Sequence, residues 1–342
     1  MPAVWIDTDM GFDDLAAVLT VVAQPCWTIE GLSLVAGNAP LPVVIDNAQR
    51  AAHFFGWEFP IHAGCDRPLV CDLVTAQNIL GDDAMRSTGR SLPLARTPLA
   101  GDDGVAALAD WLRQSESPRA VLALGPLTNL ARLLQRQPEL AARIDPLIWM
   151  GGSAGPGNHS AAAEFNAAVD PESVQAVLDA GVALCMVGLD ACRQVRVHAA
   201  DAAALRTAAL STDASRDATT DASAQASAAD AHSASSATYC RLLLADLLEG
   251  YVCIASADGS LPMALYDPVA AAALIDPTAV RFAPAHLVME LVGQHTRGMT
   301  VVERRVPRRA RANAWVATDV DEAAVRALVL QALARTGALK PP

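Results

Sequence analysis

A short apolar run that empties into a group of carboxylates is the feature that most constrains how this chain folds. Residues 4–6 are Val-Trp-Ile, and four aspartates follow within eight positions, namely Asp7, Asp9, Asp13 and Asp14. A continuous apolar run is typical of a strand buried in a parallel sheet. Ligands of open α/β sheets bind beyond the carboxyl ends of such strands, and Gly11 permits a tight turn there. The sequence therefore predicts a strand, a turn carrying carboxylates, and a helix beginning near Leu15.

The carboxylates allow two interpretations. Side chains of like charge repel one another unless a cation or hydrogen bonds compensate, and hard oxygen ligands favour calcium or magnesium over zinc. Alternatively, aspartates in the first turn of a helix simply oppose the helix dipole. An EF-hand is excluded, because its loop needs Gly at position 6 and Glu at position 12. Counted from Asp7, those positions hold Phe12 and Val18.

Composition limits the class of protein. A chain of 342 residues with 52% hydrophobic residues is long enough for one large α/β domain or two smaller ones. The net charge of −12 argues against nucleic acid or an anionic membrane as a partner. The seven cysteines are scattered and lack CxxC spacing, which favours a reducing compartment. With neither a signal-peptide pattern nor about 18 uninterrupted apolar residues, we expect a cytoplasmic protein that does not enter membranes.

Further apolar runs alternate with helix-like segments, the pattern of a parallel sheet with crossover helices. Strands are predicted at residues 29–35, 120–124, 147–150 and 183–188, and each is followed by glycine or a polar residue. Helices are predicted at residues 128–134, 239–251 and 322–336. We expect a single α/β domain spanning residues 1–342 with a mostly parallel, Rossmann-like open sheet.

One segment breaks this pattern. Residues 199–237 are nearly all Ala, Ser, Asp and Thr. Residues 202–210 are compatible with a helix, whereas 211–237 lack helical or strand periodicity and are predicted to be a poorly packed insertion. A passive surface loop and an active-site lid are both open interpretations.

A second group of polar residues lies in the middle of the chain, namely Asn158, Glu164, Asn166 and Asp170, and glycines stand nearby. Two amides and a carboxylate suit hydrogen bonding to a polyhydroxylated ligand, although asparagine is also an ordinary turn residue. Further on, Asp267 precedes Pro268 and an Ala-rich stretch. That aspartate is interpreted as a helix N-cap or as a further site residue.

Taken together and in this order, these segments resemble the inosine-uridine preferring nucleoside hydrolases, a family of calcium-dependent N-ribohydrolases. The resemblance spans nearly the whole chain apart from the low-complexity insertion. Its most specific motif is the segment from Asp7 to Asp14, whose family form is DxDxGxDD. The other matching segments are VAGN at 35–38, AGCDRPL at 63–69, LGPLTN at 124–129, MGG at 150–152, AEFN at 163–166, DPE at 170–172, DP at 267–268 and GMTV at 298–301.

The resemblance implies the nucleoside hydrolase fold and assigns roles to particular residues. Asp9, Asp14, Asp267 and the backbone carbonyl of Leu124 would hold a calcium ion. The sugar would be bound by Asp13, Asn38, Met150, Asn158, Glu164 and Asn166, whereas Asp7 has no assigned contact beyond anchoring the turn. Family members are commonly dimers or tetramers, which makes a homo-oligomer an expectation here.

The chemistry implied is hydrolysis of the N-glycosidic bond of a ribonucleoside to ribose and free base, as in purine or pyrimidine salvage. Positive charge builds up on the ribose ring in an oxocarbenium-like transition state. Asp9 would act as general base on a calcium-bound water. Glu164 and the amides would strengthen their hydrogen bonds as the ring flattens.

The sequence departs from the family at the positions that would contact the nucleobase. Many members that accept pyrimidines carry histidines where this chain has Leu80 and Tyr266, and the six tryptophans stand at neither position. Tyr266 is therefore expected to donate a hydrogen bond to the leaving base or to stack against it, although a phenol, with a pKa of about 10, is a weak acid. His232 and Tyr239 are either exposed residues or groups that close over the site.

Two other functions remain open at this stage. A ribosyl-binding protein with little catalysis would keep the sugar site and lose activation of the leaving base. A phosphatase resembling the haloacid dehalogenases would also begin with a strand ending in DxD, and Gly81-Asp82-Asp83 resembles its later acidic motif. That class needs Thr or Val where this chain has Gly11.

Overall fold

The computed structural model describes residues 1–220, 228–305 and 311–336, with only the backbone described for 212–220 and 228–236. Nine strands in this part of the chain form one sheet in the order β10-β9-β11-β6-β5-β4-β1-β2-β3. All neighbours from β11 to β3 are parallel, whereas β9 runs antiparallel to both β11 and β10. The strands are β1 (Ala3–Thr8), β2 (Thr28–Leu34), β3 (Ile61–Ala63), β4 (Arg119–Ala123), β5 (Ile144–Met150), β6 (Leu184–Val187), β9 (Val280–Met289), β10 (Thr300–Glu303) and β11 (Ala314–Val320). A separate pair comprises β7 (Arg196–Val197) and β8 (Met263–Ala264).

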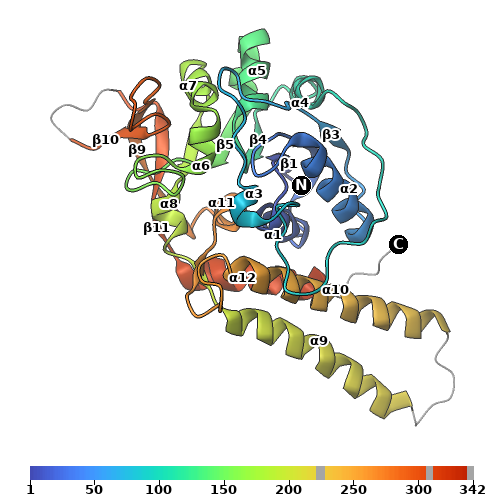
Figure 1. Cartoon of the computed structure of the whole chain (residues 1–342). Helices are drawn as coiled ribbons and strands as arrows, with labels where there is room; N and C mark the ends of the chain where they lie inside the picture. The colour runs from blue at the N-terminus through green and yellow to red at the C-terminus, as the bar shows by residue number, and fades with distance from the viewer. Residues whose placement is uncertain (221–227, 306–310, 337–342) are drawn as a thin grey trace.

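Helices cover both faces of the sheet (Figure 1). One core contains residues of α1 (Phe12–Val22), α2 (Leu41–Phe55), α10 (Ala228–Val252), α11 (Asp267–Ile275) and α12 (Glu322–Thr336), and the other contains residues of α4 (Gly104–Arg113), α5 (Thr128–Arg136) and α7 (Pro171–Asp179). The central strands alternate between these cores, since Val4 and Ile6 lie in the first and Trp5 in the second. The remaining helices are α3 (Gln77–Leu80), α6 (Phe165–Val169), α8 (Leu189–Cys192), α9 (Ala199–Thr220) and the 3₁₀ helix η1 (Pro138–Arg143).

The strand order places a ligand crevice at the carboxyl end of β1. The chain leaves β1 through α1 to β2 on one side, and β4 later pairs with β1 on the other side. Successive connections therefore diverge on either side of β1, and such a switch point is where open α/β sheets bind ligands. The aspartates that follow β1 lie at this point.

The predicted α/β class with a mostly parallel sheet is confirmed. The predicted strands fall within two residues of those observed at β2, β4 and β6, while β5 begins earlier than predicted, at Ile144. The C-terminal helix has the predicted bounds, residues 322–336. In the described part of the chain, no helix has the length and apolar character needed to cross a membrane.

Residues 211–237, predicted to be a poorly packed insertion without helical periodicity, are largely helical where the structure describes them. Helix α9 continues to Thr220 and α10 begins at Ala228, while 221–227 lie outside the described residues. The two helices lie side by side, and their far ends project from the body (Figure 1). Alanine is the best helix former, so an Ala-rich stretch forms helix without the amphipathic period that we sought.

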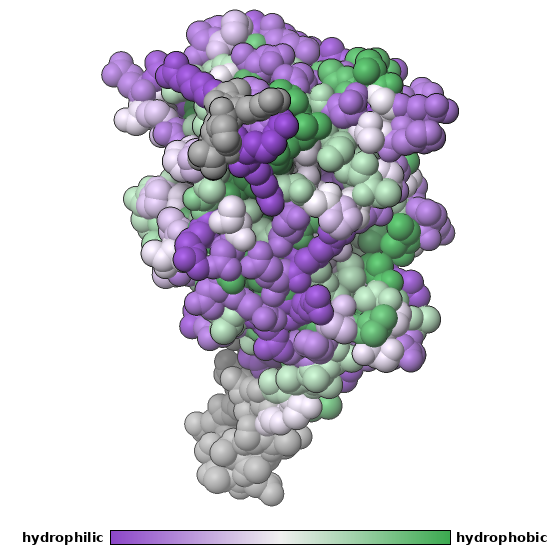
Figure 2. All heavy atoms as spheres, turned by 90° about the vertical axis from the view of Figure 1, so that its left-hand side faces the viewer, coloured by the Kyte–Doolittle hydropathy of each residue, from purple (hydrophilic) through white to green (hydrophobic). Residues whose placement is uncertain are grey.

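The face of the molecule on the β10 side carries both hydrophilic and hydrophobic side chains (Figure 2). Hydrophilic side chains predominate there, as the acidic composition predicts. Val288, Val301 and Trp315 are exposed apolar residues of β9, β10 and β11, which form this end of the sheet.

A close approach between β1 and β2 gives a test of the fold. Gly31 pairs with Trp5, and a Cβ at Gly31 would lie 2.1 Å from the indole ring. We expect Gly31→Ala to lower the free energy of unfolding by about 1–3 kcal/mol, because overpacking forces the ring to move. Chemical denaturation of the variant and the unchanged protein measures this loss.

The matched control is the same substitution in a Trp5→Leu background, where the smaller side chain leaves room. There the loss should be clearly smaller, since the two residues are in contact and their effects are not additive. An unchanged free energy of unfolding in Gly31→Ala alone would contradict the packing described.

Candidate functional site

The turn after β1 is held by hydrogen bonds to its own carboxylates. The hydroxyl of Thr8 and the backbone N–H of Gly11 both donate to Asp14, the latter at 2.8 Å. Between them, Met10 adopts a φ of 30°, a left-handed conformation that residues with a Cβ rarely take. Local strain of this kind persists only where the surroundings fix it, and it is common at functional sites.

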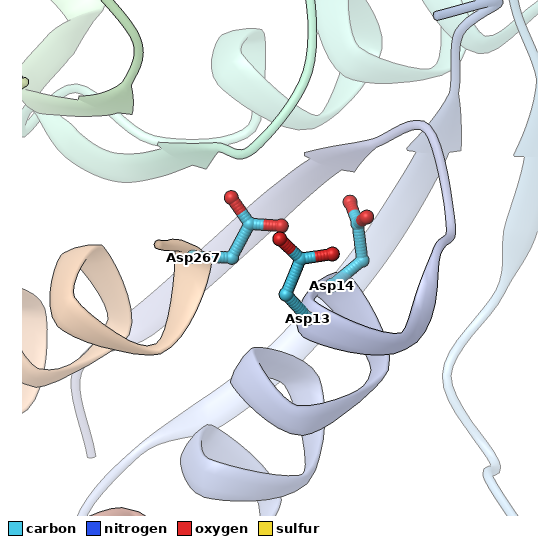
Figure 3. A group of neighbouring side chains, drawn as sticks. All are labelled: Asp13, Asp14 and Asp267. Atoms are coloured by element: carbon cyan, nitrogen blue, oxygen red, sulfur yellow. The ribbon is translucent and has the colours of Figure 1, made fainter. Parts of the chain in front are cut away.

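Three carboxylates converge at this turn (Figure 3). Asp13 and Asp14 come from the first turn of α1, and Asp267 comes from the start of α11, about 250 positions later in the chain. One oxygen from each lies within 4.8 Å of the others. Burial and the charge of Asp14 raise the pKa of Asp13 to about 7, and burial with the neighbouring aspartates raises the pKa of Asp267 well above its usual range.

Asp9 lies beside this cluster with one oxygen unsatisfied. Its Oδ2 accepts a 2.6 Å hydrogen bond from the backbone N–H of Asn38, whereas its buried Oδ1 has no hydrogen-bond partner among the described residues. Burial and the charges of Asp14 and Asp13 raise the pKa of Asp9 well above its usual range. A buried oxygen without a donor, next to three converging carboxylates, fits a hard divalent cation.

Two glycines make room for Asp9. A Cβ at Gly37 would lie 2.1 Å from Asp9 Oδ2, and one at Gly125 would lie 3.0 Å from the Asp9 carboxyl carbon. These glycines follow β2 and β4, the two neighbours of β1. The three strand ends therefore come together around this carboxylate.

Asp7 holds strands together beneath the site and does not reach the cluster of three. Its Oδ1 accepts hydrogen bonds from the hydroxyl of Ser33 on β2 and from Asn129 Nδ2 on α5, the latter at 2.7 Å. Burial raises the pKa of Asp7 to about 7. Asp7, expected to anchor the turn, is thus bonded to β2 and α5 and not to the turn itself.

The polar residues in the middle of the chain form a wall facing the carboxylates. Glu164 is the N-cap of α6: its two oxygens accept hydrogen bonds of 2.8–2.9 Å from the backbone N–H groups of Gly152, Asn166 and Ala167. Burial raises the pKa of Glu164 to about 6, against the lowering effect of these donors.

Each of the two side-chain amides in this group uses one of its two polar atoms in hydrogen bonds within the protein. Asn166 Nδ2 donates to the carbonyls of Leu124 and Met150 at 2.8 and 3.0 Å, and Asn158 Oδ1 accepts from the Phe165 N–H at 2.9 Å. Asn166 therefore offers its Oδ1 to a ligand and Asn158 its Nδ2. A carbonyl oxygen has two lone pairs, so Leu124 keeps one for a further partner.

These groups line one cavity of about 420 Å³. Every residue predicted to bind the sugar lines it, together with Leu124, Asp267 and Tyr266; Asp9 and Asp14 lie behind the lining. The sugar-binding residues predicted from sequence are thus brought together, namely Asp13, Asn38, Met150, Asn158, Glu164 and Asn166. Asp13, which was predicted to bind sugar, is one of the three members of the carboxylate cluster. Asp9, which was predicted to bind the cation, is not one of those three.

The lining of the cavity also includes a mostly apolar set of residues, many of which sequence reasoning missed. Leu80 and Tyr266, expected to contact the base, belong to the lining, and the additional residues are Val74, Thr75, Ala76, Asn78, Ile79, His159, Phe165, Tyr251, Ile254 and Met263. Most come from the segment 74–80 and from the end of α10, where no motif marks them. His159 and Phe165 flank the predicted Asn158 and Glu164, and that proximity was the only available signal.

Neither tyrosine of the cavity lining is a good acid. Burial raises the pKa of Tyr266 to about 12 and that of Tyr251 well above its usual range. The Tyr251 hydroxyl donates to the Ala264 carbonyl at 2.8 Å. Tyr239 is 39% exposed and contacts Phe54 and Arg90 instead of lining the cavity, and His232 lies where side chains are not described.

Fold and site together define an α/β protein with a carboxylate cluster and a cavity lined by amides and carboxylates at the switch point of its sheet. The model of the family described as inosine-uridine preferring nucleoside hydrolase matches residues 4–327. The chain is 31% identical over 334 residues to a pyrimidine-specific ribonucleoside hydrolase, RihA, of Shewanella woodyi, covering 96% of each chain. It is 30% identical over 319 residues to RihA of Salmonella agona, covering 92% of this chain and 93% of that one.

Solved structures show the same fold. A purine-preferring ribonucleoside hydrolase from Gardnerella vaginalis superimposes with a TM-score of 0.82 at 21% identity, covering 98% of this chain and 99% of the other. A plant nucleoside hydrolase, PpNRh1, gives a TM-score of 0.79 at 24% identity, covering 97% and 99%.

The chain belongs to the inosine-uridine preferring nucleoside hydrolase family, a family of enzymes that act on N-glycosyl bonds. The resemblance identified from the sequence is confirmed. The family does not decide the base, since the relatives above include pyrimidine-specific and purine-preferring enzymes.

The raised pKa values predict how stability depends on pH without a cation. Asp7 and Asp13 have pKa values of about 7 in the fold, against 3.8 as the ordinary value. Between these values the folded state binds more protons than the unfolded state, so stability falls as pH rises from about 4 to 7. Thermal unfolding of chelator-treated protein should show a Tm that decreases across this window.

A bound divalent cation needs ionised carboxylates and should reverse the trend. We expect calcium to raise the Tm more at pH 8 than at pH 5. Equal stabilisation at both pH values, or none at either, would contradict a cation site built from these aspartates.

Proposed function

We propose that the protein is a calcium-dependent ribonucleoside hydrolase that releases ribose and a free base, in purine or pyrimidine salvage. The observation that supports this most strongly is that one cavity is lined both by carboxylates and amides and by apolar side chains, in a chain of this family. A ribose has hydroxyls for the carboxylates and amides, and a nucleobase has an apolar face for the apolar side chains.

Asp9, Asp14, Asp267 and the Leu124 carbonyl would hold the cation. The unsatisfied Asp9 Oδ1 and the convergence of Asp14 with Asp267 support this set. When bound, the cation supplies Lewis-acid chemistry, because it polarises oxygen ligands and makes them more acidic. Asp13 lines the cavity and is half-buried, which supports the role of sugar ligand that we assign to it.

The chain's own residues would then perform three tasks. Asp9 accepts a proton from the attacking water as general base. Asn38, Asn158 and Asn166 orient the ribose, with Met150 packed beside it. Glu164 accepts hydrogen bonds from sugar hydroxyls that strengthen as positive charge develops on the ring, which stabilises the transition state more than the ground state.

Tyr266 would contact the base. Its raised pKa makes its phenol a poor proton donor, so we assign it stacking against the base or a hydrogen bond to it, without full proton transfer. Leu80 adds apolar contact on the same side of the cavity.

A substrate panel tests the proposed activity. Ribose release is measured with purine and pyrimidine ribonucleosides and with an activated riboside, before and after treatment with a chelator. We expect release from at least one ribonucleoside, loss of release with chelator, and recovery when calcium is added back. No release from any of these substrates would refute the activity, and calorimetry that detects ribose binding without hydrolysis would then favour a ribosyl-binding protein.

The role of Asp9 is tested by Asp9→Ala. Loss of a general base typically lowers the rate by about 10²- to 10⁴-fold, and here a cation ligand is lost as well, so turnover should fall to background. Circular dichroism should show an intact fold, because the side chain accepts only one backbone hydrogen bond. Activity close to that of the unchanged protein would show that another group acts as the base.

A further inference from the structure

We propose that His159 donates the proton that the leaving base needs, a task for which this chain lacks the two histidines usual in pyrimidine-accepting relatives. The inference rests on the proposed function, and it identifies the residue that acts as general acid on the leaving base. It is based on the position of His159 in the cavity lining, on the hydrogen bonds that hold its loop, and on the fact that the Tyr251 hydroxyl already donates to a backbone carbonyl.

His159 shares the cavity with the groups that would hold the nucleoside. It lines the cavity beside Phe165, and the two ring centroids lie 5.8 Å apart in an edge-to-face arrangement. The adjacent residue, Asn158, lines the same cavity and is assigned above to the ribose. We therefore place His159 within reach of a base attached to that ribose.

The loop that carries His159 is well braced. The backbone N–H groups of residues 158, 159 and 160 all donate to the Ala163 carbonyl at 3.1–3.2 Å. A Cβ at Gly157 would lie 2.1 Å from that oxygen, so the turn needs glycine there. A rigid loop keeps a proton donor in place without a large entropic cost on binding.

Two residues of α8 and its C-cap also hold this loop, namely Asp190 and Arg193. Arg193 donates to the carbonyls of Pro156 and Gly157 at 2.7 and 2.8 Å. Asp190 accepts a 2.6 Å hydrogen bond from the Ala154 N–H.

The imidazole of His159 is free to serve a ligand. No hydrogen bond to it is present among the described residues, whereas the Tyr251 hydroxyl is committed to a backbone carbonyl. His159 is the one imidazole among the residues that line the cavity. Imidazole is also the side chain best suited to exchange protons near neutral pH.

The reaction balances with these groups. The bond between C1 of the ribose and the base nitrogen breaks, and its electron pair goes to the base. The His159 imidazolium gives its proton to the base, while the oxygen of water bonds to C1 and Asp9 accepts a proton from that water. One proton is given and one is accepted, and exchange of both groups with solvent restores the starting state.

The experiment compares two leaving groups in His159→Gln. The kcat/KM is measured for the best natural ribonucleoside of the panel and for 4-nitrophenyl β-D-ribofuranoside, whose nitrophenolate leaves without a proton. We expect kcat/KM to fall by about 10²-fold or more for the nucleoside, as for loss of a general acid, and by less than about 3-fold for the nitrophenyl riboside.

His53→Gln is the matched control, because His53 is exposed on α2 and does not line the cavity. It should leave both values unchanged. Equal losses on both substrates in His159→Gln would indicate a structural role and overturn the inference, as would no loss on either. Failure of the unchanged protein to release ribose from any riboside would refute the proposed function itself, and the inference with it.

Discussion

Repulsion among the carboxylates at the end of β1 is the constraint on which the rest of the site depends. Asp13, Asp14 and Asp267 bring oxygens within 4.8 Å of one another, and the nearby Asp9 has a buried oxygen without a donor in the described part of the chain. Such a group is unfavourable in its ionised form unless positive charge is added or protons are bound. The raised pKa values are the expected response of the cation-free protein.

The architecture gathers these groups from distant parts of the sequence. The parallel sheet aligns the ends of β1, β2 and β4, and glycines after β2 and β4 leave space for Asp9. α11 packs against α1 and brings in Asp267. Glu164 caps α6 while lining the cavity, so one residue both begins a helix and presents a carboxylate to the cavity.

Much of this was predictable because the patterns are local or belong to known motifs. The apolar run before Asp7 predicted β1, and the segments resembling a known family named the residues, expected to bind the sugar, that line the cavity. Residues 202–210 and 239–251 of α9 and α10 were predicted as helix or compatible with it, but the rest of the two helices was missed because alanine propensity, and not periodicity, forms them. Tyr251, Ile254 and Met263 were missed because only tertiary packing brings them into the cavity lining, which leaves no motif in the sequence.

The polar and the apolar residues of the lining differ in how well the sequence marks them, and this difference has a physical origin. Binding a sugar and a hard cation requires particular oxygen and amide groups at fixed places, so the residue types repeat in recognisable order. Contact with a base needs mainly apolar area and one proton donor, which many residues at many positions supply. The sequence therefore identifies the residues proposed to bind the sugar far better than those proposed to contact the base, namely Leu80, Tyr266 and His159.

The central claim is that these carboxylates form a cation site that organises the sugar. A crystal structure of the protein with calcium and ribose, with the cation located by its anomalous signal, tests it most directly. The account predicts one strong peak among Asp9, Asp14 and Asp267, within coordination distance of the Leu124 carbonyl and of two ribose hydroxyls. Ribose bound in the cavity with no cation at these aspartates, or a cation bound elsewhere, would contradict it.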